Sequence, residues 1–188
     1  LGLLAGLVSN FAGTYWLIGT LDRFGGFPTP VSVLFILVLS AFSGLSYALF
    51  SYIVTRLGFI RRPGVVSALL AVAVWTSIEY IFPFLFPYGI ANSQADYIPV
   101  MQVFDLFGVY GLSFIIVVVN IALMRVLKKL TGESLLPAGE IVLALALVLA
   151  ALVYGYVRIG EVEREIARAP KLKIGMVQAN FDFLEKSE

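Results

Sequence analysis

Residues 31–55 read VSVLFILVLSAFSGLSYALFSYIVT and contain no charged side chain. A helix crosses the roughly 30 Å hydrocarbon core of a bilayer with about 20 mainly apolar residues, and this stretch is long enough to do so. Pro28 and Pro30 come just before it. Proline suits the first turn of a helix but not its interior, so these prolines mark a helix start. The stretch is predicted to be a membrane-spanning helix.

Four further stretches are apolar over a comparable length and are also predicted to span the membrane: residues 1–21, 64–86, 103–127 and 141–157. The chain of 188 residues is 60% hydrophobic and 13% charged, with a net charge of +1. Soluble domains contain about 45–50% apolar and about 25% charged residues, so this composition excludes a soluble monomer. The small net charge excludes strong electrostatic binding of nucleic acid. We predict an all-α polytopic membrane protein with five transmembrane helices.

The basic residues of the short loops predict the orientation of the helices. Six of them lie around the ends of the second and fourth spans: Arg56, Arg61, Arg62, Arg125, Lys128 and Lys129. The loops on the opposite face contribute only Arg23. Because short cytoplasmic loops carry an excess of Lys and Arg, the loops after the second and fourth spans are predicted to face the cytoplasm. Residues 22–27 and 87–102 then face outward, and the chain leaves its fifth span on the outer side.

The composition changes after residue 157. Residues 158–170 alternate acidic and basic side chains and are predicted to form a charged, solvated helical connector that Pro170 ends. Residues 171–179 alternate apolar with other side chains, which predicts a short β-strand. A single strand is not stable in water. Residues 171–188 are therefore interpreted as the start of an incomplete outer domain, and the chain as a piece of a longer protein.

The chain contains no cysteine and no histidine. It therefore has no thiol nucleophile, no disulfide, no imidazole base and no thiolate or imidazole ligand for a metal. It also lacks a Gly-rich phosphate-binding loop and a Ser/His/Asp pattern. We predict no catalytic residue, no metal site and no cofactor within these residues.

The loop between the third and fourth spans is the most unusual local feature. Residues 86–96 read FPYGIANSQAD and mix aromatic, small and amide side chains. One interpretation is an interfacial turn in which Tyr88 sits at the headgroup level. The other is the floor of a polar pocket, where amide and hydroxyl groups hold a lipid headgroup or a peptide terminus. The residues themselves leave both interpretations open.

Glu79 is an acidic residue within the third span, and it follows Trp75 by four positions, so the two side chains share one helix face. A carboxylate at mid-membrane costs roughly 2.5–3.5 kcal/mol on insertion scales, which makes a functional role the default hypothesis. Glu79 lies in the outer half of the span. A structural hydrogen bond to the neighbouring outer loop is therefore the competing explanation.

Several segments, in order, carry a family resemblance. Residues 13–16 read GTYW and residues 24–30 read FGGFPTP; residues 75–79 read WTSIE; residues 107–114 read FGVYGLSF and follow the outer loop; residues 174–180 read IGMVQAN. All of these segments except the last, together with the outer loop, resemble the membrane domain of bacterial apolipoprotein N-acyltransferases. The last resembles the first strand of a nitrilase-type domain.

The resemblance implies an inner-membrane enzyme with eight spans and a periplasmic α/β nitrilase-like domain. On this pattern the chain lacks two spans before Leu1 and, after Glu188, most of the outer domain and the last span. The family's catalytic Glu, Lys and Cys would all lie beyond Glu188. The implied partners are a phospholipid acyl donor and a diacylglyceryl lipoprotein, whose N-terminal α-amine accepts the acyl chain.

The resemblance also implies site residues. Tyr88, Asn92 and Gln94 are the expected substrate contacts on the lipid side, with Trp75 and Glu79 supporting the loop from below. The family commonly has Trp at the position of Tyr88, so the aromatic ring is kept but its contact differs.

Two other functions are compatible with a membrane domain of this kind. A transporter or a non-enzymatic scaffold is one, although a transporter should show charged or broken-helix sites near the midplane, or an inverted repeat, and neither is evident. A membrane domain fused to a polyprenol-phosphate mannosyltransferase is the other. The reading frame on either side of these residues distinguishes the three.

Overall fold

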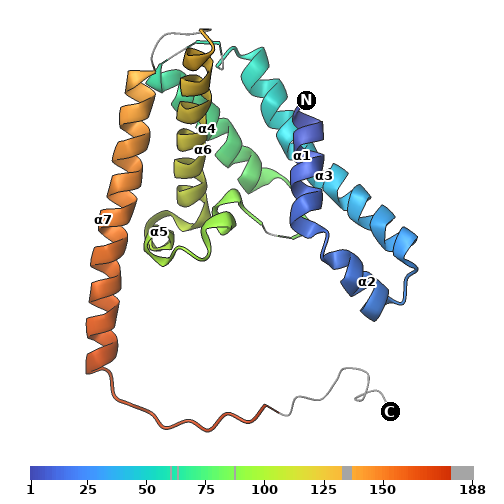
Figure 1. Ribbon diagram of the computed structural model, residues 1–188. Helices are drawn as coiled ribbons and strands as arrows, with labels where there is room; N and C mark the ends of the chain where they lie inside the picture. Colours follow the sequence, from blue (N-terminus) through green and yellow to red (C-terminus); the bar gives the residue numbers. More distant parts are fainter. Residues whose placement is uncertain (60, 63, 87, 133–136, 179–188) are drawn as a thin grey trace.

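The computed structural model describes residues 1–59, 61–62, 64–86, 88–132 and 137–178. All regular structure in these residues is helical (Figure 1): α1 (Gly2–Thr14), α2 (Leu17–Gly25), α3 (Thr29–Arg56), α4 (Val65–Ile81), the 3₁₀ helix η1 (Ile90–Gln94), α5 (Ile98–Met101), α6 (Phe104–Leu130) and α7 (Ala138–Arg168). Helices α3, α6 and α7 are long and apolar enough to cross a membrane, and α1 and α4 are shorter apolar helices. The predicted all-α architecture is confirmed in the described residues, whereas only three of the five predicted spans are helices of spanning length.

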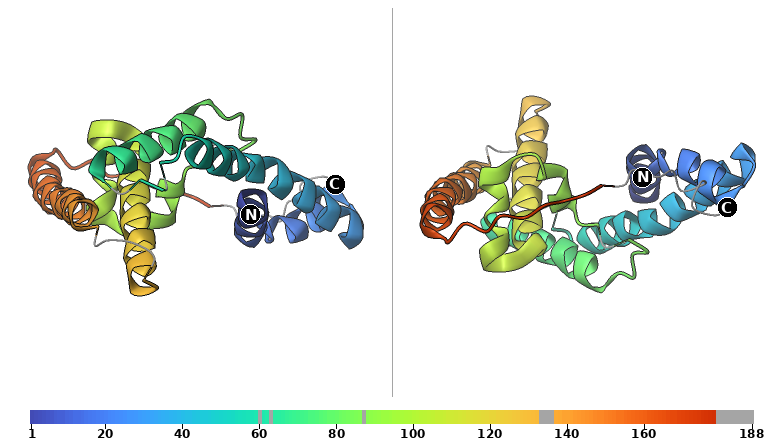
Figure 2. Two further views of the ribbon diagram at one scale, coloured as in Figure 1. Left: turned by 90° about the horizontal axis from the view of Figure 1, so that it is seen from above. Right: turned by 90° about the horizontal axis from the view of Figure 1, so that it is seen from below.

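The helices form two groups. Helices α1 and α2 pack against α3, whereas α4, α6 and α7 pack against one another, and α3 joins the groups through α4. The views from above and below separate the groups in the same way (Figure 2). The buried core lies in the second group and consists of Val72, Trp75, Val117, Val118, Ala122 and Ala144. Trp75 extends this core toward α3, where its ring lies 5.0 Å from that of Tyr47 and 5.3 Å from that of Phe50.

The first predicted span is not one helix. Helix α1 ends at Thr14, and α2 begins at Leu17 after a turn. The Thr14 hydroxyl donates a 2.7 Å hydrogen bond to the carbonyl of Asn10, and the Trp16 indole donates one of 3.1 Å to the carbonyl of Gly13. Side chains that bond to nearby backbone compete with the helical ladder and bend helices. A hydropathy pattern cannot predict these hydrogen bonds, so it does not predict the break between α1 and α2.

Three other helices differ from the predicted spans, two of them because of a proline or a glycine. Helix α4 ends at Ile81 rather than at residue 86, because Phe82 precedes Pro83 and is therefore extended, with ψ of 131°. Helix α6 is interrupted at Gly108, whose φ of 61° and ψ of −164° are reached almost only by glycine. Helix α7 continues to Arg168 without a break, so residues 158–168 extend the fifth span as helix.

The predicted strand is not formed in residues 171–178, the part of it that the structure describes, and residues 179–188 lie outside the described residues. Residues 171–178 extend below the helices (Figure 1). Its apolar side chains are exposed, with Ile174 at 76% and Val177 at 96%. A strand requires a partner strand, and the described chain offers none.

A buried ion pair joins α6, α7 and the α3–α4 loop. Arg125 pairs with Glu140, and the two residues are 5% and 3% exposed. The Arg125 guanidinium also donates to the carbonyl of Arg62 at 3.0 Å, and the Gly64 amide donates to Glu140 at 2.7 Å. The sequence-based orientation counts Arg125 as a loop charge, but the structure buries it inside the helix packing. The positive charge of Arg125 therefore pairs with Glu140 inside the protein.

Candidate functional site

Hydrogen bonds to α4 and α6 hold the outer loop in place. The Ile90 amide donates a 2.6 Å hydrogen bond to Glu79 Oε1 at the end of α4, and the Ala91 amide donates one of 3.3 Å to the Ser113 hydroxyl on α6. Gly89 fits closely between these helices, because a Cβ there would lie 3.1 Å from Glu79 Oε1. The carboxyl group thus fixes the start of η1 against the end of α4.

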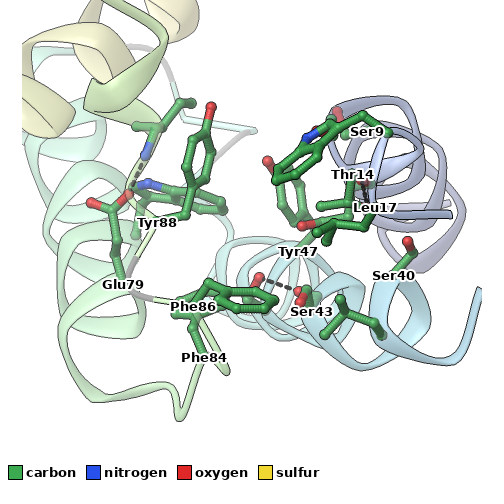
Figure 3. Close-up of a pocket in the computed structure, with 17 residues that line it drawn as sticks. Ser9, Thr14, Leu17, Ser40, Ser43, Tyr47, Glu79, Phe84, Phe86 and Tyr88 are labelled. Atoms are coloured by element: carbon green, nitrogen blue, oxygen red, sulfur yellow. Dashed lines mark hydrogen bonds between the residues drawn. The ribbon is translucent and has the colours of Figure 1, made fainter. Parts of the chain in front are cut away.

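A cavity of about 490 Å³ lies beside this loop, between α1, the start of α2, α3, α4 and the loop residues Phe84, Phe86, Tyr88 and Ile90. Its lining combines apolar and polar side chains: Ser9, Asn10, Gly13, Thr14, Trp16, Leu17, Leu39, Ser40, Ser43, Ser46, Tyr47, Trp75, Glu79, Phe84, Phe86, Tyr88 and Ile90. Figure 3 shows Glu79 and Tyr88 on one side and Ser9, Tyr47 and Ser40 across from them. The volume lies within the range of about 300–1,000 Å³ that is usual for small-ligand pockets.

Three buried polar atoms that belong to lining residues have no hydrogen-bond partner among the described residues. They are Nε1 of Trp75, Oε2 of Glu79 and Oγ of Ser40. The two carboxylate oxygens of Glu79 therefore differ: Oε1 accepts a hydrogen bond from the Ile90 amide of the loop, and Oε2 has no donor in the described residues. Trp75 supplies a donor and Glu79 an acceptor from the same helix face, one turn apart.

The structure brings only some of the sequence-predicted site residues together. Trp75, Glu79 and Tyr88 line the cavity, and Tyr88 remains 59% exposed. Asn92 and Gln94 lie on η1 and do not line it. Asn92 is exposed, and the Gln94 amide donates to the Ser93 hydroxyl at 3.2 Å. These two amides face a different part of the surface from the cavity.

Sequence reasoning missed the wall formed by α1 and α3. Ser40, Ser43 and Ser46 recur at helical spacing on α3 and line the cavity together with Tyr47. Serines at this spacing also occur wherever membrane helices simply pack closely. Only the pairing of α3 with α1 and α4 distinguishes a cavity wall from a packing seam, so no local signal could have identified it.

Tyr97 lies on the loop beyond η1, outside the spans. A hydrogen bond with Tyr156 of α7, reinforced by the charge interaction between the two phenols, raises the pKa of Tyr97. Nearby, Arg158 Nε donates a 2.8 Å hydrogen bond to Asp105 Oδ2. These contacts tie the outer end of α7 to the segment that precedes α6. In the described ranges, no group of three acidic residues is placed to hold a metal ion.

Comparison with known proteins gives one family. The model of the apolipoprotein N-acyltransferase N-terminal domain matches residues 1–122. The chain is 31% identical to the apolipoprotein N-acyltransferase of Geobacter metallireducens over 97% of this chain and 35% of that protein. It is 29% identical to that of Haemophilus ducreyi over 90% of this chain and 32% of that protein. The chain thus spans about a third of the length of these relatives. No solved structure matches it.

Proposed function

Because the chain belongs to the apolipoprotein N-acyltransferase family through its N-terminal membrane domain, we propose that it forms the membrane portion of such an enzyme. The reaction is transfer of an acyl chain from a phospholipid to the N-terminal α-amine of a diacylglyceryl-cysteine lipoprotein. The similarity to the Geobacter protein along 97% of the chain carries this proposal. The apolar helices support a multi-pass membrane location.

The proposed chemistry takes place outside these residues. In the family resemblance the acyl chain is carried as a thioester on a cysteine, a glutamate acts as base and a lysine stabilises the oxyanion. This chain contains no cysteine. Its own contribution is then to bind and orient the lipid-bearing substrates at the outer membrane surface. We expect residues 1–188, expressed alone, to form no thioester.

The proposed location is the bacterial inner membrane, with the outer loop and the end of α7 on the periplasmic side. The bias of basic side chains toward the α3–α4 and α6–α7 loops supports this orientation, since Arg61, Arg62 and Lys129 remain exposed there. The outer loop and the cavity would then lie where periplasmic substrates and the outer leaflet meet.

Tyr88, Asn92 and Gln94 are the proposed lipid-side contacts, and Trp75 and Glu79 support them. The position of Tyr88 at the cavity supports its assignment. Asn92 and Gln94 would act on a substrate group that lies above the loop. The Glu79 hydrogen bond to the Ile90 amide supports the bracing role of the carboxyl group.

The test uses the complete gene product in phospholipid vesicles with a diacylated lipopeptide. Mass spectrometry detects the mass of one added acyl chain on the peptide. Tyr88→Ala and Gln94→Ala should each lower the transfer rate roughly 2- to 10-fold, the value of one neutral hydrogen bond. Tyr52→Ala and Gln102→Ala are matched controls, because neither residue belongs to the outer loop of residues 86–96 or lines the cavity.

Two outcomes are informative against the proposal. No acylated peptide from the folded complete protein contradicts the proposed reaction. Full transfer by both Tyr88→Ala and Gln94→Ala contradicts the contact assignment and leaves the outer loop as an interfacial anchor.

A further inference from the structure

A groove lies at the opposite end of α1 from the outer loop. It has a volume of about 660 Å³ and is formed by the start of α1, the last turns of α3 and the α3–α4 loop. Figure 1 shows the start of α1 beside α3, toward the end of the molecule at which α3 connects to α4. The described lining consists of Leu1, Gly2, Leu3, Ala48, Ser51, Tyr52, Thr55, Arg56 and Arg61. A Cβ on Gly2 would lie 2.7 Å from the Ser51 Cβ, so direct contact between the two helices closes one side of the groove.

Two arginines without partners line this groove. Arg56 and Arg61 are exposed, and within the described residues neither side chain forms an ion pair or a hydrogen bond. Arg125, in contrast, pairs with Glu140. No acidic side chain belongs to the described lining of the groove. Because like charges repel each other and an anion between them removes this repulsion, the groove is suited to a negatively charged group.

Two hydroxyl groups add hydrogen-bonding capacity beside the arginines. Ser51 and Thr55 line the groove, and in the part of the chain that the structure describes neither hydroxyl is hydrogen-bonded. Guanidinium groups bind phosphate through paired N–H donors, and hydroxyl groups donate to its remaining oxygens. These donors therefore match a phosphate, which accepts hydrogen bonds at several oxygens.

The rest of the groove is apolar, which favours a lipid over a soluble anion. Helix α3 is long and apolar enough to cross a membrane, and Arg56 lies in its last turn. Ala48 comes eight residues before Arg56, which is about 12 Å along a helix axis. Leu3 of α1 is 42% exposed. The groove thus runs from the charged end of a membrane helix toward its apolar part, and a fitting ligand has an anionic head and an apolar chain.

We propose that this groove binds an anionic phospholipid, with Arg56 and Arg61 holding the phosphate and an acyl chain lying along Leu3 and Ala48. The site lies apart from the outer-loop cavity and does not depend on the proposed acyl transfer. In the proposed orientation it belongs to the cytoplasmic leaflet, whereas the outer-loop cavity belongs to the periplasmic side. A lipid in the groove then holds the start of α1 and the end of α3 at the cytoplasmic membrane surface.

The net charge of the lipid determines the expected selectivity. The ammonium group of a zwitterionic lipid offsets its phosphate, whereas phosphatidylglycerol keeps a net negative charge. Each arginine near an anionic membrane surface strengthens binding about fivefold. Two arginines at one headgroup should therefore favour phosphatidylglycerol over phosphatidylcholine roughly 5- to 25-fold.

The experiment measures lipid retention by native mass spectrometry on the complete gene product in detergent. Phosphatidylglycerol and phosphatidylcholine of identical acyl composition are titrated separately, and inorganic phosphate forms the third arm. The wild type should retain phosphatidylglycerol more tightly than phosphatidylcholine by the factor given above. Inorganic phosphate, which lacks an acyl chain, should not compete with phosphatidylglycerol at equal concentration.

The variants locate the binding site. Arg56→Gln and Arg61→Gln should each lower retention of phosphatidylglycerol about fivefold and leave phosphatidylcholine nearly unchanged. Arg62→Gln is the matched control, because Arg62 is an exposed arginine of the same loop that does not line the groove. Its contact with Arg125 uses the backbone carbonyl, which the variant keeps. Retention by Arg62→Gln should equal that of the wild type. Size-exclusion chromatography checks that all three variants are folded.

Three results would overturn the site. Unchanged retention of phosphatidylglycerol by the double variant Arg56→Gln/Arg61→Gln shows that the arginines bind no lipid and leaves the groove to other parts of the complete protein. An equal loss in Arg62→Gln shows a general attraction of the basic surface instead of binding in the groove. Competition by inorganic phosphate at equal concentration shows an anion site that does not use the apolar wall.

The failure of this site is distinguishable from the failure of the proposed function. Acyl transfer to the diacylated lipopeptide is measured on the same preparations. Acyl transfer by a protein whose lipid retention does not depend on Arg56 and Arg61 overturns this site alone. Arginine-dependent retention of phosphatidylglycerol in a protein that transfers no acyl chain supports the site and overturns the proposed function alone.

Discussion

Removing the charge of Arg125 should destabilise the fold more than removing the whole ion pair. Arg125→Met leaves the buried Glu140 carboxyl group with only the Gly64 amide as a donor, and the carbonyls of Arg62 and Phe59 lose their donor. Breaking one side of a buried pair typically costs about 3–5 kcal/mol. For a chain of this size about 1 kcal/mol shifts the midpoint of thermal unfolding by roughly 2–4 °C, so Arg125→Met should lower it by about 6–20 °C.

The double variant Arg125→Met/Glu140→Met provides the decisive comparison. Replacing a buried pair by apolar side chains is often neutral or stabilising, so the double variant should recover much of the loss. It should not recover it all, because the loop groups at Arg62 and Gly64 stay unpaired at about 1–3 kcal/mol each. Thermal unfolding in detergent, followed by size-exclusion chromatography, measures both. A double variant as unstable as the sum of the two single variants would refute the reasoning.

Three further predictions concern the backbone and one surface carboxylate. Gly108→Ala should cost about 1–3 kcal/mol in unfolding free energy, because its φ of 61° with ψ of −164° suits glycine, whereas Gly160→Ala, in open space on α7, should be neutral or stabilising. Gly155→Ala should loosen α5 from α7, since its Cβ would fall 1.8 Å from the Pro99 carbonyl oxygen, and hydrogen exchange of residues 97–103 should rise. The nearby Ser32 hydroxyl and the hydrogen bond from Thr29 lower the pKa of Asp22 below its usual 3.8. The stabilisation by Asp22 is thus present above pH 3.8 and is lost as the pH falls through the lowered value; a Tm deficit of Asp22→Asn that persists in strong acid would contradict this.

The positions of the apolar helices could be predicted from sequence because each depends on composition over some twenty residues. The breaks could not, since they depend on single contacts such as the Thr14 hydroxyl on the Asn10 carbonyl. Pro83 is an exception, because a proline restricts the residue before it and the end of α4 could have been read from it. The prediction that the third span continues to residue 86 gives hydropathy more weight than the restriction that Pro83 places on Phe82.

Some residues of the candidate site could likewise be predicted from the sequence, and others could not. Glu79 could be identified because a carboxyl group among apolar residues is visible in the sequence, and its spacing from Trp75 places both on one face. Ser40 could not, because a serine on an apolar helix has the same appearance in a cavity wall and in a helix interface. The family resemblance groups Asn92 and Gln94 with Tyr88, but in the structure these two residues of η1 do not line the cavity.

The two walls of the cavity are held by different means. Helix α4 is anchored at both ends by polar contacts: Glu140 accepts from Gly64 just before its start, and Glu79 accepts from Ile90 near its end. Helix α1 packs against α3 through close contact of Gly6 with Gly44, where a Cβ on Gly6 would lie 2.7 Å from the Gly44 Cα. Contact this close leaves no room for α1 and α3 to approach further, so steric fit holds this wall. The wall that carries Glu79 and Trp75 is therefore positioned by hydrogen bonds at its ends, and the wall formed by α1 and α3 is positioned by the close packing of glycines.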